Sequence, residues 1–96
     1  MSKFPLGRLF ATPGAMEALE KAGQSASEFF ARHARCDWGE VCEEDARLND
    51  EALENGSRLL SAYKTKCGGT RLWVLTEAAD DEGRRAATTI LRPEEY

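Results

Sequence analysis

The chain has 96 residues, of which 42% are hydrophobic and 31% charged, and its formal net charge is −4. A chain of this length has room for one hydrophobic core but not for two, and its composition excludes a disordered or membrane-embedded protein. We therefore expect a single domain spanning residues 1–96.

The first residues contain no apolar run of the length found in a secretory signal, and no later segment approaches the length of a membrane span. The three cysteines, Cys36, Cys42 and Cys67, do not form the dense framework of a disulfide-rich secreted domain. The sequence thus predicts a cytoplasmic protein with reduced thiols and no contact with membranes.

The negative charge is concentrated in one segment. Residues 1–36 contain five basic and three acidic side chains, whereas residues 37–54 contain eight acidic side chains against a single base, Arg47. The remainder of the chain is nearly balanced. This one segment therefore accounts for the acidity of the whole chain.

The amino-terminal part predicts a short extended segment and then a helix. Residues 6–11 form either an edge strand or an extended arm. Thr12 followed by Pro13 is typical of a helix start, and apolar residues continue at helical spacing as far as Gly23. A first helix is expected over residues 13–22.

A second helix is predicted over about residues 26–35. Ser25 and Glu28 have the spacing of a capping box, in which each side chain accepts a hydrogen bond from the backbone amide of the other residue. Phe29 and His33 lie one helical turn apart and suit a buried face.

A third helix is predicted from Asp37, its N-cap, to the pair Asn55-Gly56, a favoured helix end. Placing its residues at intervals of about 100° separates two faces. The apolar face contains Trp38, Val41, Cys42, Leu48, Ala52 and Leu53. The acidic face contains Glu40, Glu43, Glu44, Arg47, Asp50, Glu51 and Glu54.

Beyond Gly56 the hydrophobic period changes to that of a strand. Strands are predicted over residues 58–64, 71–77 and 87–91, with a hairpin turn at residues 67–70. Consecutive strands with short connections form antiparallel meanders, and a sheet with one apolar face needs a cover. The predicted fold is α+β, with three N-terminal helices on one face of a C-terminal three-stranded antiparallel meander and, as an option, a short N-terminal edge strand.

Asp45 and Asn49 interrupt the apolar face of the third helix, one turn apart. Burying a carboxylate without a partner is costly, so partners are expected if this face is buried. Two interpretations stay open, a structural network that ties the third helix to the first meander strand and a binding or catalytic cluster. The expected buried polar network contains His33, Asp45, Asn49, Arg58, Ser61 and Tyr63.

The acidic face of the third helix is either an ordinary solvated surface or a surface that offers negative charge to a basic partner. It has one base, Arg47, and no lysine placed at i,i+4 to balance its carboxylates, which favours a role in binding. The predicted partner-binding residues are Glu40, Glu43, Glu44, Asp50, Glu51 and Glu54.

No cofactor, metal ion or catalytic residue is predicted. His33, Cys36, Cys42 and Cys67 lack the CxxC spacing that is typical of zinc sites. A nucleophilic pair of cysteine and histidine, or an acid–base pair of Asp45 and His33, can be drawn. The single histidine has no oxyanion-type loop to accompany it.

The first hairpin is basic and aromatic, which makes direct binding of nucleic acid an alternative. The overall acidity and the lack of a nucleic-acid-binding motif argue against it. The surface that such binding would use consists of Arg58, Tyr63, Lys64, Arg71 and Trp73.

Several motifs together resemble a group of small bacterial proteins that are labelled hypothetical or plasmid-related and occur near mobile elements. The resemblance covers about two-thirds of the chain, and Cys36 stands where the pattern of the group has glycine. It implies a bacterial accessory protein concerned with host defence. The residues that carry it are His33, Asp37-Trp38-Gly39, Glu44-Asp45, Asn49, Gly56-Ser57-Arg58, Ser61, Tyr63, Leu72-Trp73-Val74-Leu75-Thr76-Glu77 and Thr88-Thr89-Ile90-Leu91-Arg92-Pro93-Glu94-Glu95-Tyr96.

The leading hypothesis is a small acidic adaptor or inhibitor, encoded by a mobile element, that binds a protein partner. The expected partner is a nucleic-acid-handling complex of the restriction or CRISPR type. One alternative is a module that binds nucleic acid or a small ligand through its sheet. Another is a small enzyme centred on His33, Asp45 and Asn49. The oligomeric state is left open.

Overall fold

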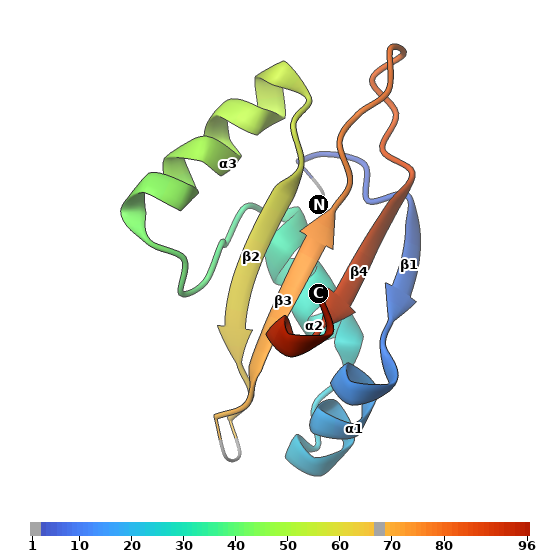
Figure 1. Cartoon of the computed structure of the whole chain (residues 1–96), viewed down its shortest axis with the longest axis vertical. Helices are drawn as coiled ribbons and strands as arrows, with labels where there is room; N and C mark the ends of the chain where they lie inside the picture. The colour runs from blue at the N-terminus through green and yellow to red at the C-terminus, as the bar shows by residue number, and fades with distance from the viewer. Residues whose placement is uncertain (1–2, 67–68) are drawn as a thin grey trace.

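The computed structural model describes residues 3–66 and 69–96 (Figure 1). Three α-helices, four strands and a short 3-10 helix are present in these ranges. In chain order they are β1 (Arg8–Ala11), α1 (Pro13–Ala22), α2 (Ala26–Ala34), α3 (Glu43–Asn55), β2 (Leu59–Lys64), β3 (Arg71–Thr76), β4 (Ala87–Leu91) and η1 (Pro93–Glu95). The α+β class predicted from the sequence is confirmed.

Helix α1 has the predicted bounds and the predicted start. The Thr12 hydroxyl accepts a hydrogen bond from the Ala15 amide at 3.2 Å, and Pro13 occupies the first turn, where its missing N–H costs nothing. Gly23 ends the helix with φ 66°, a left-handed conformation that glycine adopts without a steric penalty.

Helix α2 forms where it was predicted, but the predicted capping box does not. The Ser25 hydroxyl is bonded to the Ser27 hydroxyl at 3.0 Å, and the Glu28 carboxylate accepts from Gln24 Nε2 at 2.9 Å. At the other end of α2, Cys36 has φ 67°. A left-handed conformation is uncommon for a residue other than glycine, because the side chain crowds the backbone.

The predicted start of the third helix is wrong by five residues, because the N-cap is Cys42 and not Asp37. Helix α3 begins at Glu43, and the Cys42 thiol accepts from the Asp45 amide at 3.4 Å. Residues 38–40 instead run beside β2 as an isolated parallel bridge, because the Ala62 amide donates to Trp38 O at 3.1 Å and the Glu40 amide donates to Ala62 O at 2.6 Å. Backbone groups used in this way are not available to a helix.

The sheet has the strand order β1-β4-β3-β2. The β2–β3 and β3–β4 pairs are antiparallel, as predicted for the meander, whereas β1 pairs with β4 in parallel. The sheet is therefore four-stranded and mixed, a correction to the three-stranded antiparallel prediction. The four residues of β1 carry no sequence signal that indicates which strand they pair with. Two residues of the predicted hairpin turn, Cys67 and Gly68, lie outside the described residues.

The helices do not all cover one face of the sheet, as the sequence predicted. Helix α2 lies behind the sheet in the view of Figure 1, α1 lies at its lower end, and α3 lies beside the outer edge of β2. The main core lies between the sheet and the first two helices. It contains Ala15, Ala18, Leu19, Phe29, Phe30, Tyr63, Leu72, Val74 and Ile90. A second cluster under α3 contains Phe4, Trp38, Ala52 and Leu59.

No helix among the described residues is long and apolar enough to cross a membrane. The longest, α3, has 13 residues and a charged outer surface.

Candidate functional site

The exposed surface of α3 is the first part of the candidate site. Only Asn49 and Ala52 of this helix are buried, while the side chains of Leu48 and Leu53 are 53% and 37% exposed. The predicted apolar face is thus much narrower in the structure. The helix contacts the body along one line and leaves most of its circumference to solvent.

The six predicted partner-binding residues are all exposed, but they differ in what they contact. Glu40 precedes the helix and lies 3.7 Å from Lys64 Nζ. Asp50 accepts a hydrogen bond from Trp38 Nε1 at 3.0 Å, which holds the indole against α3.

The other four residues form the acidic surface of α3, which we define as Glu43, Glu44, Glu51 and Glu54. Within the described part of the chain none of them forms an ion pair. The whole helix contains six carboxylates and one guanidinium, a net charge of −5. Arg47, four residues from both Glu43 and Glu51, is the single base of this helix, so it offsets only one of the six negative charges.

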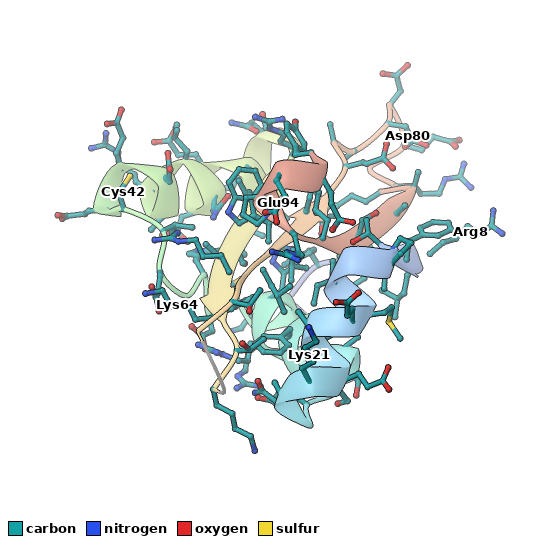
Figure 2. All side chains as sticks on the ribbon, turned by 60° about the horizontal axis from the view of Figure 1, so that its bottom comes forward. Arg8, Lys21, Cys42, Lys64, Asp80 and Glu94 are labelled. Atoms are coloured by element: carbon teal, nitrogen blue, oxygen red, sulfur yellow. The ribbon has the colours of Figure 1, made fainter. Side chains whose placement is uncertain are left out.

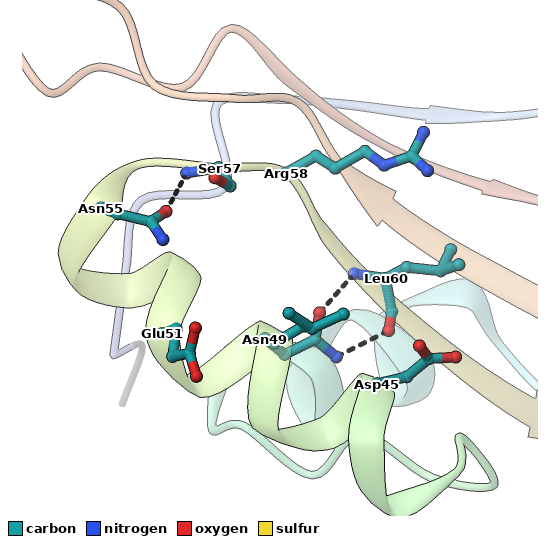
Figure 3. A pocket seen from close by; sticks show the side chains of 8 residues that line it. Asp45, Asn49, Glu51, Asn55, Ser57, Arg58 and Leu60 are labelled. Atoms are coloured by element: carbon teal, nitrogen blue, oxygen red, sulfur yellow. Dashed lines mark hydrogen bonds between the residues drawn. The ribbon is translucent and has the colours of Figure 1, made fainter.

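A groove of about 330 Å³ lies between α3 and the start of β2 (Figure 3). It contains two apolar side chains, Leu48 and Leu60, and the carboxylates of Asp45 and Glu51 on the α3 side. The Arg58 side chain extends away from α3, and its Nη1 donates to the Tyr96 hydroxyl at 2.5 Å. The groove can therefore accept a side chain that has both an apolar part and a positive charge.

Asn49 joins the groove to the sheet. Its Nδ2 donates to Leu60 O at 2.8 Å, and its Oδ1 accepts from the Leu60 amide at 3.1 Å (Figure 3). A side-chain amide thus pairs with the edge of β2 as a neighbouring strand would. This pairing, together with the buried cluster that contains Ala52 and Leu59, attaches α3 to the sheet.

His33 and Ser61 of the predicted network do meet, in the core. His33 has no exposed surface, its Nδ1 lies 2.5 Å from the Ser61 hydroxyl, and its Nε2 lies 2.8 Å from the Thr76 hydroxyl. The chain of hydrogen bonds continues from Thr76 to Thr88 at 2.7 Å and from Thr88 to Leu6 O at 2.7 Å. The two threonines were not predicted to take part.

The direction of each hydrogen bond follows from the last one. A carbonyl oxygen only accepts, so the Thr88 hydroxyl donates to Leu6 O and must accept from Thr76. Thr76 has then used its own proton and accepts from His33 Nε2–H, which leaves Nδ1 to accept from Ser61. The ring is neutral, and burial together with the nearby Arg85 charge lowers the pKa of His33 to about 4.

The other predicted members of the network lie elsewhere. Asp45 and Arg58 are exposed, and Asn49 bonds only to the backbone of Leu60. Tyr63 is buried, and its hydroxyl donates to Asp37 O at 2.5 Å. The six residues were expected together because Asp45 and Asn49 interrupt the predicted apolar face of the third helix, but only Asn49 and Ala52 of α3 are buried, and Asp45 lies in the exposed groove.

Arg32 and Asp37 complete the environment of Tyr63. The Arg32 guanidinium lies 4.5 Å from the centre of the Tyr63 ring, and its Nε donates to Asp37 Oδ2 at 2.7 Å. Desolvation by burial raises the pKa of Tyr63 to about 12, and the Arg32 hydrogen bond lowers the pKa of Asp37. This arrangement stabilises the turn after α2.

The structure does not bring His33, Asp45 and Asn49 into one open cleft, which the enzyme alternative required. His33 is enclosed, Asp45 lies on the surface, and Asn49 is occupied by the β2 edge. Among residues 3–66 and 69–96 no group of three or more His, Cys, Asp or Glu side chains is arranged to hold a metal ion. Cys36 and Cys42 are free thiols.

The surface named for the sheet alternative is divided. Tyr63 faces the core, whereas Arg71 is exposed and Trp73 is half-buried on the opposite face, where its ring contacts Tyr96 at 5.8 Å. Lys64 pairs with Glu40. The five residues therefore do not form one exposed face.

Sequence reasoning missed Arg85, which has the most unusual environment in the described chain. It is buried, 6% exposed, and no carboxylate contacts its guanidinium. Nη1 donates to Ser57 O at 2.7 Å and to Glu77 O at 3.1 Å, and Nη2 donates to Ala52 O at 2.9 Å. Its position in a charged loop made it look like an ordinary surface arginine.

Together, the fold and the site define a small α+β protein in which an acidic helix and a groove flank one edge of a mixed sheet. Comparisons with protein-family models, with curated proteins and with solved structures gave no match.

Proposed function

We propose that this protein is a small acidic adaptor or inhibitor that binds a protein partner through α3 and the groove beside it. The observation that carries the proposal is the acidic surface of α3, Glu43, Glu44, Glu51 and Glu54, which is exposed and has no ion-pair partner in the described chain. A basic partner surface would relieve the repulsion between these side chains.

The groove offers an apolar contact surface in addition to the negative charge of α3. Electrostatic complementarity accelerates association and selects partners, while affinity depends mainly on a few desolvated contacts. Leu48, at 53% exposed, and half-buried Leu60 provide apolar surface next to the carboxylates of Asp45 and Glu51. An arginine or lysine of the partner fits this site, with its aliphatic part on the leucines and its charge between the carboxylates.

The partner we propose is a bacterial nucleic-acid-handling complex, of the restriction or CRISPR type, in the cytoplasm. Proteins that bind nucleic acid present surfaces rich in lysine and arginine, because these residues neutralise phosphates. A helix with a net charge of −5 offers negative charge to the same surface. The resemblance to proteins encoded near mobile elements supports this choice.

The proposal is tested by affinity capture from a bacterial lysate at low and moderate salt, with three forms of the protein. The first is wild type, and the second carries Glu43→Lys, Glu44→Lys and Glu51→Lys. The third is a matched control with Glu17→Lys, Glu20→Lys and Glu28→Lys. These three glutamates are also exposed, and reversing them changes the net charge of the chain by the same amount.

The expected result is a nucleic-acid-handling complex retained by wild type and by the control, released by moderate salt, and not retained by the α3 variant. A partner bound equally by all three forms would contradict the proposal. So would binding that is unaffected by salt, because exposed charge pairs are screened at high ionic strength.

The alternative, a module that binds nucleic acid or a small ligand through its sheet, is supported by fewer residues. Arg71 is exposed and Trp73, two residues further along β3, is half-buried, and this pair offers a nucleotide base an aromatic ring and a positive charge. A titration with a single-stranded oligonucleotide, followed by Trp fluorescence, separates the two functions. Quenching that Arg71→Glu abolishes and that the α3 variant retains would favour the sheet.

A further inference from the structure

One of the two outer edges of the sheet is covered and the other is open. The outer edge of β2 is occupied, since Asn49 pairs with Leu60 and residues 38–40 pair with Ala62. Among residues 3–66 and 69–96 no strand pairs with the outer edge of β1, and every residue of β1 is exposed. An unpaired edge is a template for another strand, which natural proteins ordinarily cover or charge.

The hydrogen-bonding groups that β1 leaves free can be assigned. The Arg8 amide donates to Ala86 O and the Thr12 amide donates to Ile90 O, both at 3.0 Å, so these residues direct their amides toward β4. Backbone groups alternate in direction along a strand. The N–H and C=O groups of Leu9 and Ala11 therefore point away from the sheet.

We propose that this edge pairs with β1 of a second copy of the chain, in antiparallel orientation about a two-fold axis at Phe10. In this register Leu9 of each copy lies opposite Ala11 of the other copy. The four free backbone groups of one strand then pair with the four of the other, which gives four hydrogen bonds. Phe10 of one copy lies opposite Phe10 of the other. The proposal goes beyond the function proposed for α3 and does not depend on it.

The register follows from the limits of the strand. Gly7 leaves the strand with φ 68°, and Pro13 has no amide to donate. Moving the centre of pairing toward either residue loses two of the four hydrogen bonds. A centre at Phe10 places Arg8 opposite Thr12 of the other copy, so no like charges face one another.

The side chains along this edge are apolar in the middle of the strand. Leu9 is 53% exposed and Phe10 is 49% exposed, and the Arg8 guanidinium lies over the Phe10 ring at 5.8 Å. Directly opposed aromatic residues in antiparallel strands attract one another. A second copy supplies an aromatic partner for Phe10 and a methyl group for Leu9.

The size of the interface sets the expected strength of the dimer. A four-residue strand buries less than the area of a standard stable interface, so we expect a weak dimer that forms at high protein concentration. Helix α3 and β1 lie at opposite sides of the molecule in Figure 1, and Cys42, at the start of α3, and Arg8 of β1 lie at opposite sides in Figure 2. The dimer would therefore present two copies of α3 at the two ends of one continuous sheet.

The test is sedimentation equilibrium from about 10 µM to about 1 mM protein, with wild type and two matched variants. Phe10→Lys places like charges opposite each other at the dimer axis, and Met16→Lys changes an equally exposed apolar residue of α1. We expect wild type to dimerise within this range, Phe10→Lys to weaken the dimer about tenfold or more, and Met16→Lys to leave it unchanged. Far-UV circular dichroism and urea midpoints confirm that both variants fold.

A second measurement addresses the register. In a background without the three native cysteines, Phe10→Cys is expected to form a disulfide-linked dimer on mild oxidation, because opposed residues at this kind of site have Cα atoms about 4.5 Å apart. Arg8→Cys, which would face Thr12, is expected to cross-link far less. A wild-type protein that stays monomeric at about 1 mM, equal effects of the two lysine variants, or equal cross-linking of the two cysteine variants would overturn the proposal.

Discussion

His33 shows how a single titratable residue can be locked into one protonation state. Both ring nitrogens are hydrogen-bonded to hydroxyl groups, and the rings of Phe4 and Trp38 pack edge-on at 5.3 and 5.6 Å. A proton added to Nδ1 would face the Ser61 hydroxyl, which would have to turn its own proton away. The fold therefore favours the neutral ring.

This arrangement predicts a dependence of stability on pH. The pKa of His33 is about 4 in the folded protein against 6.5 when exposed, so the unfolded chain binds the proton more tightly. The stabilisation is fully present above pH 6.5 and is lost as the pH falls toward 4. The free energy of unfolding should fall by about 2 kcal/mol by pH 5 and by about 3 kcal/mol in total.

Urea unfolding followed by Trp fluorescence between pH 7 and pH 5 measures this loss. The pKa values of Asp37 and Glu95 are also lowered, but their contribution is lost mainly at lower pH, near and below their usual values. The control is His33→Gln, which keeps a polar side chain without a titration in this range. If the free energy of unfolding of His33→Gln falls as much as that of wild type between pH 7 and pH 5, protonation of His33 is not the cause of the loss.

At the scale of elements, the attachment of α3 depends on one side chain. Asn49 is the only residue of the helix that hydrogen-bonds to the sheet with both a donor and an acceptor among the interactions the structure describes. Two further hydrogen bonds reach α3 from outside the sheet, one from Trp38 Nε1 to Asp50 and one from Arg85 Nη2 to Ala52 O. The helix that carries the acidic surface is therefore attached at few points.

Replacement of Asn49 should detach the helix locally. Asn49→Ala leaves the N–H and C=O of Leu60 without partners at a half-buried edge, and we expect it to cost about 2 kcal/mol of unfolding free energy. Asn49→Asp keeps the acceptor but places a carboxylate against Leu60 O, so it should not restore stability at pH 7. Amide hydrogen exchange of α3 should accelerate in both variants.

The matched control is Asn55→Ala, which removes one exposed hydrogen bond, from the Ser57 amide to Asn55 Oδ1 at 2.8 Å. We expect this variant to lose well under half as much stability. Equal losses for Asn49→Ala and Asn55→Ala would show that the pairing with β2 does not hold the helix.

At the scale of the whole molecule, Arg85 joins parts of the chain that are distant in sequence. Its three hydrogen bonds reach the end of α3, the connection to β2 and the segment after β3. The carbonyl of Ala52 belongs to the last turns of α3, where the helix dipole favours a positive charge. Desolvation lowers the pKa of Arg85, which nevertheless stays protonated.

Arg85→Met should destabilise the whole domain, because three carbonyl groups lose their donor in a buried place. We expect a loss of about 3 kcal/mol and a single cooperative transition, measured by urea unfolding. Arg84→Met is the control, since its neighbour Arg84 is exposed and pairs only with Glu82. A loss in Arg85→Met no larger than in Arg84→Met would contradict the role we assign to this residue.

The sequence by itself determined the features that depend on local chemistry. The bounds of α1 follow from Thr12, Pro13 and Gly23, and the end of α3 from Gly56. The three meander strands followed from the change in hydrophobic period, because alternation along a strand sorts residues between a buried and an exposed face.

Only the tertiary structure decided which distant segments pair. Residues 38–40 look helical in isolation, yet their backbone groups pair with β2, a gain that helical propensity cannot outweigh. Asn49 pairs with the edge of β2, whereas Asp45, one turn earlier on the same side of α3, lines the exposed groove. The parallel pairing of β1, the enclosure of His33 and the burial of Arg85 likewise depend on contacts between residues far apart in the chain, which local patterns do not encode.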